Sequence, residues 1–309
     1  MFHTFLMVGH QVLILFILIG VGVICNKVHF LTETVVKGMN NIVLYFVTPC
    51  LMLVSFQRAK EPSLMKGLLL TCIFGFASHI LAILVANLAI HDKDRASELI
   101  MRFGVIFGNC GFMSLPIQRA ILGDDGVFYG AVFIAVFNVV LWTYGLKTIS
   151  EGTEKITVRK LLLNPGIIGM VLGLLVFLTG FRFPDIVEQP IEYIADLNTP
   201  IPMFIIGYYL GNLHWKDLTS NKKQYIAILL RTIGVPFLTM AIMLPFHIDP
   251  VVFIAVTIAS CSPVAAKAAM FATKYDKNPQ LGSEMVSVST LMSLITMPLV
   301  ITASEIIIH

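Results

Sequence analysis

Two short segments of this 309-residue chain gather residue types that break helices and bind ligands. Residues 107–116 read FGNCGFMSLP, and residues 259–267 read ASCSPVAAK. Gly and Pro both disfavour a continuous helix. A Ser stands two residues before Pro116 and directly before Pro263, an order typical of a helix N-terminus. We therefore predict a broken helix in each segment, with the two breaks crossing at these prolines.

The chemistry that such a pair of breaks could perform is anion binding. A helix N-terminus presents free N–H groups and about half a positive charge. The side chains able to orient an anion there are Asn109, Ser114, Ser260 and Ser262. Arg119 and Lys267 follow the prolines by about one turn, so each is either an anion ligand or a cation that extends to the membrane surface. The alternative for both breaks is a pair of proline kinks required only for packing.

The elements that must position these segments are membrane-spanning helices. Hydrophobic residues make up 57% of the chain and charged residues 13%, against about 25% charged in soluble domains. Apolar runs of about 20 residues recur along the chain, long enough to cross a bilayer about 30 Å thick. The composition predicts an all-α, polytopic protein in a lipid bilayer. It excludes nucleic-acid binding and a soluble enzyme.

Charged and Pro-, Gly- or Asn-rich breaks divide the chain into ten expected spans. These lie near 8–25, 38–56, 64–90, 100–121, 126–147, 161–181, 190–212, 224–244, 250–273 and 281–305. Most Lys and Arg residues outside the spans lie in loops that follow odd-numbered spans. Positive loops face the cytoplasm, so we predict a multi-pass plasma-membrane protein with both termini outside.

The two halves of the chain resemble each other. Pro49 in the second span matches Pro202 in the seventh, and Pro116 in the fourth matches Pro263 in the ninth. We predict a first five-helix repeat over 1–149, a short cytoplasmic linker over 150–160 and a second repeat over 161–309. An odd number of crossings inverts the second copy, and inverted repeats are typical of secondary transporters.

Some residue types are absent from the places where other functions need them. No Asp or Glu lies near the centre of an expected span, so a carboxylate relay for protons or sodium has no obvious carrier. His79 is the only histidine deep in a span, and Arg231 is interpreted as a structural residue within reach of the cytoplasm. We find no nucleophile–base pair, nucleotide-binding loop or metal motif. We therefore expect neither an enzyme nor a cofactor.

Several spaced motifs carry a resemblance to a known family. They are Asn40 with Pro49, Asn109 through Pro116 to Gly123, Asn164-Pro165, and Pro263 through Phe271 and Pro279 to Pro298. In this order the chain resembles the auxin efflux carrier family, which includes the plant PIN carriers and bacterial permeases for malate or malonate.

The resemblance implies ten helices in two inverted five-helix repeats. Helices one, two, six and seven would form a scaffold that often dimerises, and helices three to five and eight to ten a mobile transport domain. The family's substrate-binding positions fall on Asn40, the stretch around Pro49, Asn109, Asn138 and Asn164. Lys267 replaces a non-polar residue of the family, which favours a strongly anionic substrate such as a dicarboxylate.

Together these features predict a secondary transporter of a small organic anion, auxin-like or malate-like. It would work by alternating access of the elevator type, as a homodimer. Two alternatives stay open. One is a proton- or sodium-coupled carrier of the same fold, and the other is a membrane sensor that binds a ligand without transporting it.

Overall fold

The computed structural model describes residues 2–154, 163–213 and 221–308, and this part of the chain is helical. Of the expected linker 150–160, residues 155–160 lie outside the described residues. The described residues contain no strand apart from one isolated bridge between Gly108 and Val264. The all-helical class predicted from composition is therefore confirmed.

The helices before the linker are α1 (Phe2–Lys27), α2 (Glu33–Ile42), η1 (Val43–Val47), α3 (Thr48–Phe56), α4 (Pro62–Ala89), α5 (Arg95–Ile106), η2 (Cys110–Ser114), α6 (Leu115–Val140), η3 (Leu141–Gly145) and α7 (Leu146–Ile149). Those after it are α9 (Pro165–Thr179), α10 (Asp185–Asp196), α11 (Pro200–Gly211), α12 (Lys223–Leu229), η5 (Leu230–Gly234), α13 (Val235–Met243), η6 (Leu244–Phe246), α14 (Pro250–Ser260), α15 (Lys267–Lys274) and α16 (Pro279–Ile308).

Six helical segments of the described residues are long and apolar enough to cross a membrane, and α9 and α14 are shorter apolar helices. Large hydrophobic side chains are widely exposed on the outside of the molecule, as on α4, where Leu88 is 78% exposed. Such a surface matches a lipid environment. The expected span 190–212 is divided at Leu197–Thr199 between α10 and α11, a break that we did not predict.

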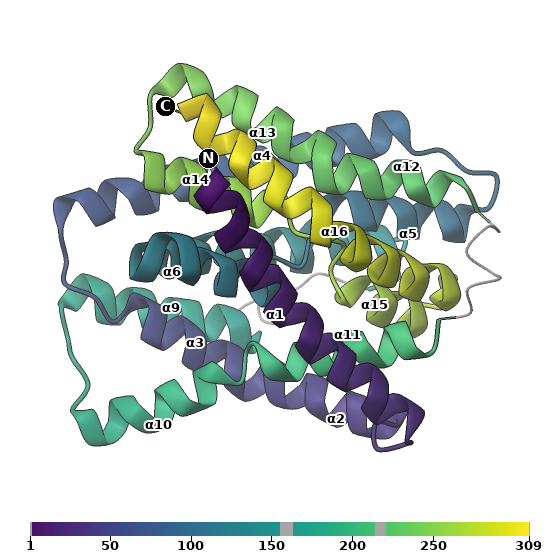
Figure 1. Ribbon diagram of the computed structural model, residues 1–309, viewed down its shortest axis with the longest axis horizontal. Helices are drawn as coiled ribbons and strands as arrows, with labels where there is room; N and C mark the ends of the chain where they lie inside the picture. Colours follow the sequence, from purple (N-terminus) through teal and green to yellow (C-terminus); the bar gives the residue numbers. More distant parts are fainter. Residues whose placement is uncertain (1, 155–162, 214–220, 309) are drawn as a thin grey trace.

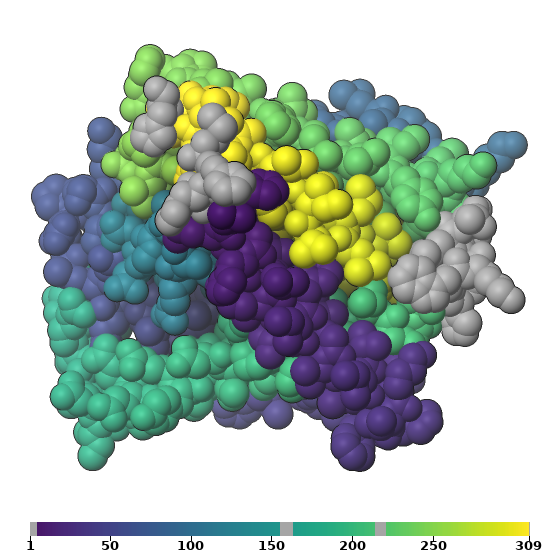
Figure 2. All heavy atoms as spheres, in the orientation of Figure 1, coloured from purple at the N-terminus to yellow at the C-terminus, as the bar shows by residue number. Residues whose placement is uncertain are grey.

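One group of helices packs through close backbone contact at small residues. A Cβ atom on Gly207 of α11 would lie 2.4 Å from the carbonyl oxygen of Ile19 in α1, and one on Gly169 of α9 would lie 2.5 Å from the Cα of Pro49 in α3. Such contacts are typical of membrane helices. In Figures 1 and 2, α1 crosses the front of the molecule beside α16.

A second group, formed by α4–α7 and α12–α16, encloses an aromatic core. His79 of α4 is buried there, with its ring centroid 5.3 Å from that of Phe133 and 6.1 Å from that of Phe137. Phe107 stacks on Phe103 at 4.6 Å in the same core. This core lies directly behind the helix break at residue 107, so the break is held by rigid aromatic packing.

Candidate functional site

Both segments that the sequence analysis singled out are broken, and the two breaks meet. Helix α5 ends at Ile106 and η2 begins at Cys110, while α14 ends at Ser260 and α15 begins at Lys267. The backbone N–H of Asn109 donates to the carbonyl of Pro263 at 2.7 Å, and that of Ala265 donates to the carbonyl of Phe107 at 2.9 Å. These two bonds form the antiparallel bridge between Gly108 and Val264. We call this region the crossover.

The residues at which the two helices are broken differ from those expected. Pro116 lies in the first turn of α6, six residues after η2 begins, so the chain crosses at Gly108 rather than at Pro116. Proline lacks an N–H and is well tolerated in the first turn of a helix, so it does not force a break there. Pro263 lies in the extended segment before α15 and does not start that helix.

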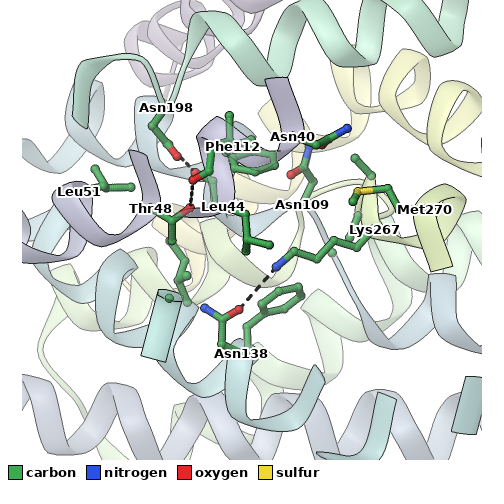
Figure 3. Close-up of a pocket in the computed structure, with 18 of the residues that line it drawn as sticks. Asn40, Leu44, Thr48, Leu51, Asn109, Phe112, Asn138, Asn198, Lys267 and Met270 are labelled. Atoms are coloured by element: carbon green, nitrogen blue, oxygen red, sulfur yellow. Dashed lines mark hydrogen bonds between the residues drawn. The ribbon is translucent and has the colours of Figure 1, made fainter. Parts of the chain in front are cut away.

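A small cavity of about 100 Å³ lies beside the crossover. We call it the central cavity (Figure 3). Its polar lining residues in the described part of the chain are Asn40, Thr48, Asn109, Asn138, Trp142, Asn198 and Lys267. Its apolar walls include Leu44, Phe112, Phe137 and Met270. No Asp or Glu is among the described residues that line it.

Lys267, the first residue of α15, is the only cation among the described lining residues. Its Nζ donates to the Oδ1 of Asn138 at 3.5 Å and lies 5.0 Å above the ring of Phe137 (Figure 3). One long hydrogen bond and one aromatic face leave most of the three-donor capacity of an ammonium group unused. The Lys267 side chain therefore turns towards the cavity and does not extend to the membrane surface.

Two further N–H groups of the cavity wall lack acceptors. The Nδ2 of Asn109 and the Nε1 of Trp142 are both buried, and neither has a hydrogen-bond partner among the described residues. Buried polar groups normally have a partner. The donors of Asn109 and Trp142 have almost no accessible surface, so a ligand reaches them only when the cavity wall shifts. All three underused groups are donors, so the ligand that would complete them is an acceptor.

The facing wall of the cavity comes from the first group of helices. Asn40 of α2 lies near Asn109, and Thr48 and Asn198 lie together on the other side (Figure 3). The Nδ2 of Asn198 donates to the carbonyl of Gly111 at 2.9 Å. Asn198 lies in the break between α10 and α11, so this bond joins that unpredicted break to the crossover.

The twelve predicted site residues divide into those that line the central cavity and those that do not. Asn40, Asn109, Asn138 and Lys267 line it. The remainder are Ser114, Ser260, Ser262, Pro49, Asn164, Pro116, Arg119 and Pro263, which are not among its lining residues.

The three serines bond to helix carbonyls instead of facing the cavity. Ser114 donates to Ile258 at 3.1 Å, Ser260 to Thr257 at 2.9 Å and Ser262 to Ala259 at 2.9 Å. Asn164 caps α9 by accepting hydrogen bonds from the N–H groups of Gly166 and Ile167. The hydroxyls and this carboxamide oxygen are thus used in local structure, as is common for Ser and Asn in helical segments.

Two other cavities adjoin the central one. An outer cavity of about 240 Å³ shares Leu51 and Asn198 with it and is lined by Pro116 and Arg119. Arg119 forms an ion pair of 3.7 Å with Asp196 and is more than half exposed. An inner cavity of about 950 Å³ shares Asn40 and Met270 with it, and its charged lining residues include Lys274 and Glu33. The names outer and inner follow the orientation expected from the positive loops.

Arg231 has a role that the sequence did not reveal. It lies in η5, is 3% exposed and does not reach the cytoplasm. Its guanidinium donates to the carbonyl of Ser260 at 2.7 Å and to that of Ile106 at 3.2 Å. Arg231, which is not among the lining residues of the cavity, therefore joins the ends of both broken helices. An arginine within an apolar stretch was the only signal in the sequence.

Comparison with known proteins gives matches over the length of the chain. The model of the family described as "Membrane transport protein" matches residues 7–301. An uncharacterized transporter of Methanocaldococcus jannaschii is 23% identical over 310 residues, which cover 93% of this chain and 96% of that relative. An uncharacterized transporter of Methanothermobacter thermautotrophicus is 22% identical over 293 residues, covering 93% and 95%.

A plant protein matches over a shorter stretch. Auxin efflux carrier component 8 of Arabidopsis thaliana is 25% identical over 158 residues, which cover 49% of this chain and 43% of the plant protein. The family match and these relatives agree with the motifs from Asn40 to Pro298. The chain belongs to the membrane transport protein family, the family of the auxin efflux carriers.

Proposed function

We propose that this membrane transporter carries a small organic anion and binds its carboxylate in the central cavity. The observation that supports this most strongly is the set of underused donors on the cavity wall: Lys267, Asn109 and Trp142. A carboxylate offers about four acceptor sites, and charge-assisted hydrogen bonds are the strongest kind. The cavity volume of about 100 Å³ favours a small substrate, since drug-sized ligands occupy roughly 300–1,000 Å³.

The series of three cavities supports alternating access. The central cavity borders the outer one at Leu51 and Asn198 and the inner one at Asn40 and Met270. The inner cavity is the largest of the three, and its charged lining residues are Glu33, Lys37, Lys274 and Glu284. The orientation predicted from the positive loops favours a position on the cytoplasmic side. We infer a cytoplasm-facing state in which the bond from Asn198 to Gly111 closes the outer side.

The packing supports an elevator arrangement of two inverted repeats. Under exchange of the repeats, α1 corresponds to α9 and α3 to α11. The contact of α1 with α11 then corresponds to that of α9 with α3, and both use close approach at glycine. We propose that these helices, with α2 and α10, form the scaffold and the dimer interface. The second group of helices would then carry the crossover across the membrane.

We propose that transport is not coupled to protons or sodium. The described lining of the central cavity holds no carboxylate to carry a proton or bind a cation. His79, the candidate for the proton-coupled alternative, lies in the aromatic core and is not among the lining residues. The sensor alternative differs in one observable property, since a sensor binds the anion without net flux.

Uptake into proteoliposomes tests the proposal. Purified protein is reconstituted with a panel of radiolabelled mono- and dicarboxylates, and binding of the same panel is followed by thermal shift in detergent. We expect at least one small carboxylate to raise the melting temperature and to be taken up. Binding without uptake would favour the sensor, and no response to any carboxylate would contradict the anion site.

A further inference from the structure

Beside the crossover, and away from the lining of the central cavity, lies a buried cation that has no acidic partner among the described residues. The guanidinium of Arg231 donates to the carbonyls of Val105 at 3.4 Å, Ile106 at 3.2 Å, Ser260 at 2.7 Å and Ser262 at 3.1 Å. Its fifth bond is to the Oγ of Ser262 at 3.4 Å. All of its hydrogen-bond acceptors in the described part of the chain are thus uncharged oxygens.

Three of these oxygens belong to the C-terminal ends of two helices, and Ser262 lies two residues after the end of the second one. Helix α5 ends at Ile106 and α14 ends at Ser260. A helix C-terminus carries about half a negative charge, so the two ends together supply about one negative charge. Arg231 supplies one positive charge. Burial of an unpaired charge in an apolar interior is very costly, and this match of charges explains how Arg231 is kept there.

The backbone is shaped to admit the guanidinium. A Cβ atom on Gly108 would lie 2.2 Å from the Nη2 of Arg231 and 2.4 Å from the Oγ of Ser262. Any residue larger than glycine at 108 would therefore displace the guanidinium or the crossover backbone. Gly108 and Arg231 form one unit although 123 positions separate them in the sequence.

We propose that Arg231 is the built-in counter-ion of the crossover and occupies a position that would otherwise bind a free monovalent cation. Four carbonyl oxygens and a hydroxyl are the kind of ligands that hard cations take. Because the charge is covalently attached, it stays with the crossover through the whole cycle. Arg231 is thus a positioning residue that keeps both breaks open without a bound metal ion. Its effect on flux rests on the proposed transport function, whereas its effect on cation binding does not.

This assignment makes a prediction that a purely structural arginine would not. Arg231→Ala leaves a hole lined by carbonyl oxygens, and a free guanidinium ion fits the hole that the side chain has vacated. Arg231→Met removes the charge but fills most of the hole. Cation rescue should therefore occur in the alanine variant and not in the methionine variant.

The experiment measures melting temperature and carboxylate flux in three cation backgrounds: choline, sodium, and choline with millimolar guanidinium. We expect the wild type to be the same in all three. Arg231→Ala should lose flux by about tenfold or more, because several charge-assisted hydrogen bonds are lost. Guanidinium should restore much of this flux and raise the melting temperature, with sodium acting more weakly. Arg95→Ala, at an arginine that is 58% exposed and lines none of the three cavities, is the matched control without rescue.

Two outcomes would overturn the proposal. One is a folded Arg231→Ala variant whose melting temperature ignores every cation, and the other is a wild type whose melting temperature or flux requires sodium. If the alanine variant does not fold, Gly108→Ala takes its place. It keeps the charge but displaces the guanidinium, so it should lose flux without cation rescue, and wild-type flux in it would contradict the proposal. A failure of flux in the wild type, with the cation response of Arg231→Ala intact, would contradict only the transport function.

Discussion

The two sides of the crossover differ in how their polar groups are satisfied. On one side, the carbonyls of Ile106 and Ser260 accept hydrogen bonds from Arg231 of the same chain. On the other side, the N–H groups of Asn109 and Trp142 have no partner among the described residues. The acceptor side is complete within the protein, whereas the donor side is left open. A buried donor without a partner costs free energy, so the open side is where a ligand gains most by binding.

The largest effect on this comparison is expected from Lys267→Met. The substitution removes the only cation of the described cavity lining while keeping a long apolar side chain. A hydrogen bond to a charged group contributes roughly 1.5–3 kcal/mol, so carboxylate affinity should fall by roughly ten- to a hundredfold. Isothermal titration of the purified protein measures it.

The melting temperature of Lys267→Met distinguishes the cavity side of the crossover from the Arg231 side. Lys267 has one long hydrogen bond and no ion pair among the described residues, so its loss should leave the melting temperature unchanged or raised. Arg231→Met should instead lower it, because several carbonyls lose their donor. Lys274→Met, at a lysine of the inner cavity that is 57% exposed, is the control, with affinity close to wild type. A lower melting temperature in Lys267→Met would show that both cations serve the fold.

Membrane potential gives the next largest effect. The charge of Arg231 is balanced within the crossover, so the net charge moved in one cycle is that of the anion. One elementary charge is worth about 2.3 kcal/mol per 100 mV, which biases a monoanion outward by about fiftyfold when the inside is negative. Flux is measured in proteoliposomes with a potassium potential set by valinomycin, with and without a pH gradient.

The same measurement tests the proton-coupled alternative. His79→Gln keeps a polar group in the aromatic core and removes the only histidine deep in an expected span. We expect its flux to follow the potential as in the wild type. Flux that ignores the potential, follows the pH gradient and loses that dependence in His79→Gln would establish proton symport.

The sequence predicted the existence of both breaks because their cause is local. Gly108 and Asn109 weaken a helix wherever they stand, and the residues around Pro263 do the same. The residue at which the two breaks cross was not predictable. Pro116 is compatible with the first turn of α6, and the crossing point depends on the close approach of Gly108 to Arg231. Asn40, Asn109, Asn138 and Lys267, four of the residues expected at the site, line one cavity.

The residues that sequence reasoning missed depend on contacts between distant segments. Arg231 reaches Ile106 across 125 positions, and Asn198 reaches Gly111 across 87. Trp142, which the sequence analysis did not single out, lines the central cavity. Nothing in the local pattern around these residues distinguishes them from buried helix residues, because only the fold decides which donors are left without partners.

Asn109→Ala should give a smaller effect than Lys267→Met. Loss of a neutral donor to a carboxylate should weaken affinity by about tenfold, with little change in stability because the Nδ2 has no partner to lose. Ser114→Ala is the matched control. Its hydroxyl donates to Ile258 at 3.1 Å, so stability should fall by about 1 kcal/mol at unchanged affinity. If Ser114→Ala instead lost affinity and Asn109→Ala lost only stability, the ligand would be shown to bind at Ser114 and not in the central cavity.

The smallest effect is expected in the loops that follow α7 and α15, away from both sides of the crossover. Lys277 donates a hydrogen bond to Glu151, and this bond, with the charge of Lys277, lowers the pKa of Glu151 below its ordinary value of 4.5. A carboxyl group whose pKa is lowered in the folded state stabilises the protein when the pH is above its ordinary pKa. This stabilisation is lost as the pH falls through the lower pKa of the folded state. The melting temperature of the wild type should therefore drop slightly more between pH 7 and pH 4 than that of Glu151→Gln. Lys277→Met should remove only part of this increment, because Arg95 also pairs with Glu151 at 3.6 Å. The double variant should lose no more than Glu151→Gln alone. Because this pair does not touch the crossover, its pH response measures how much of the acid sensitivity of the melting temperature comes from the loops. Additive losses of stability in the double variant would show that the two residues act separately.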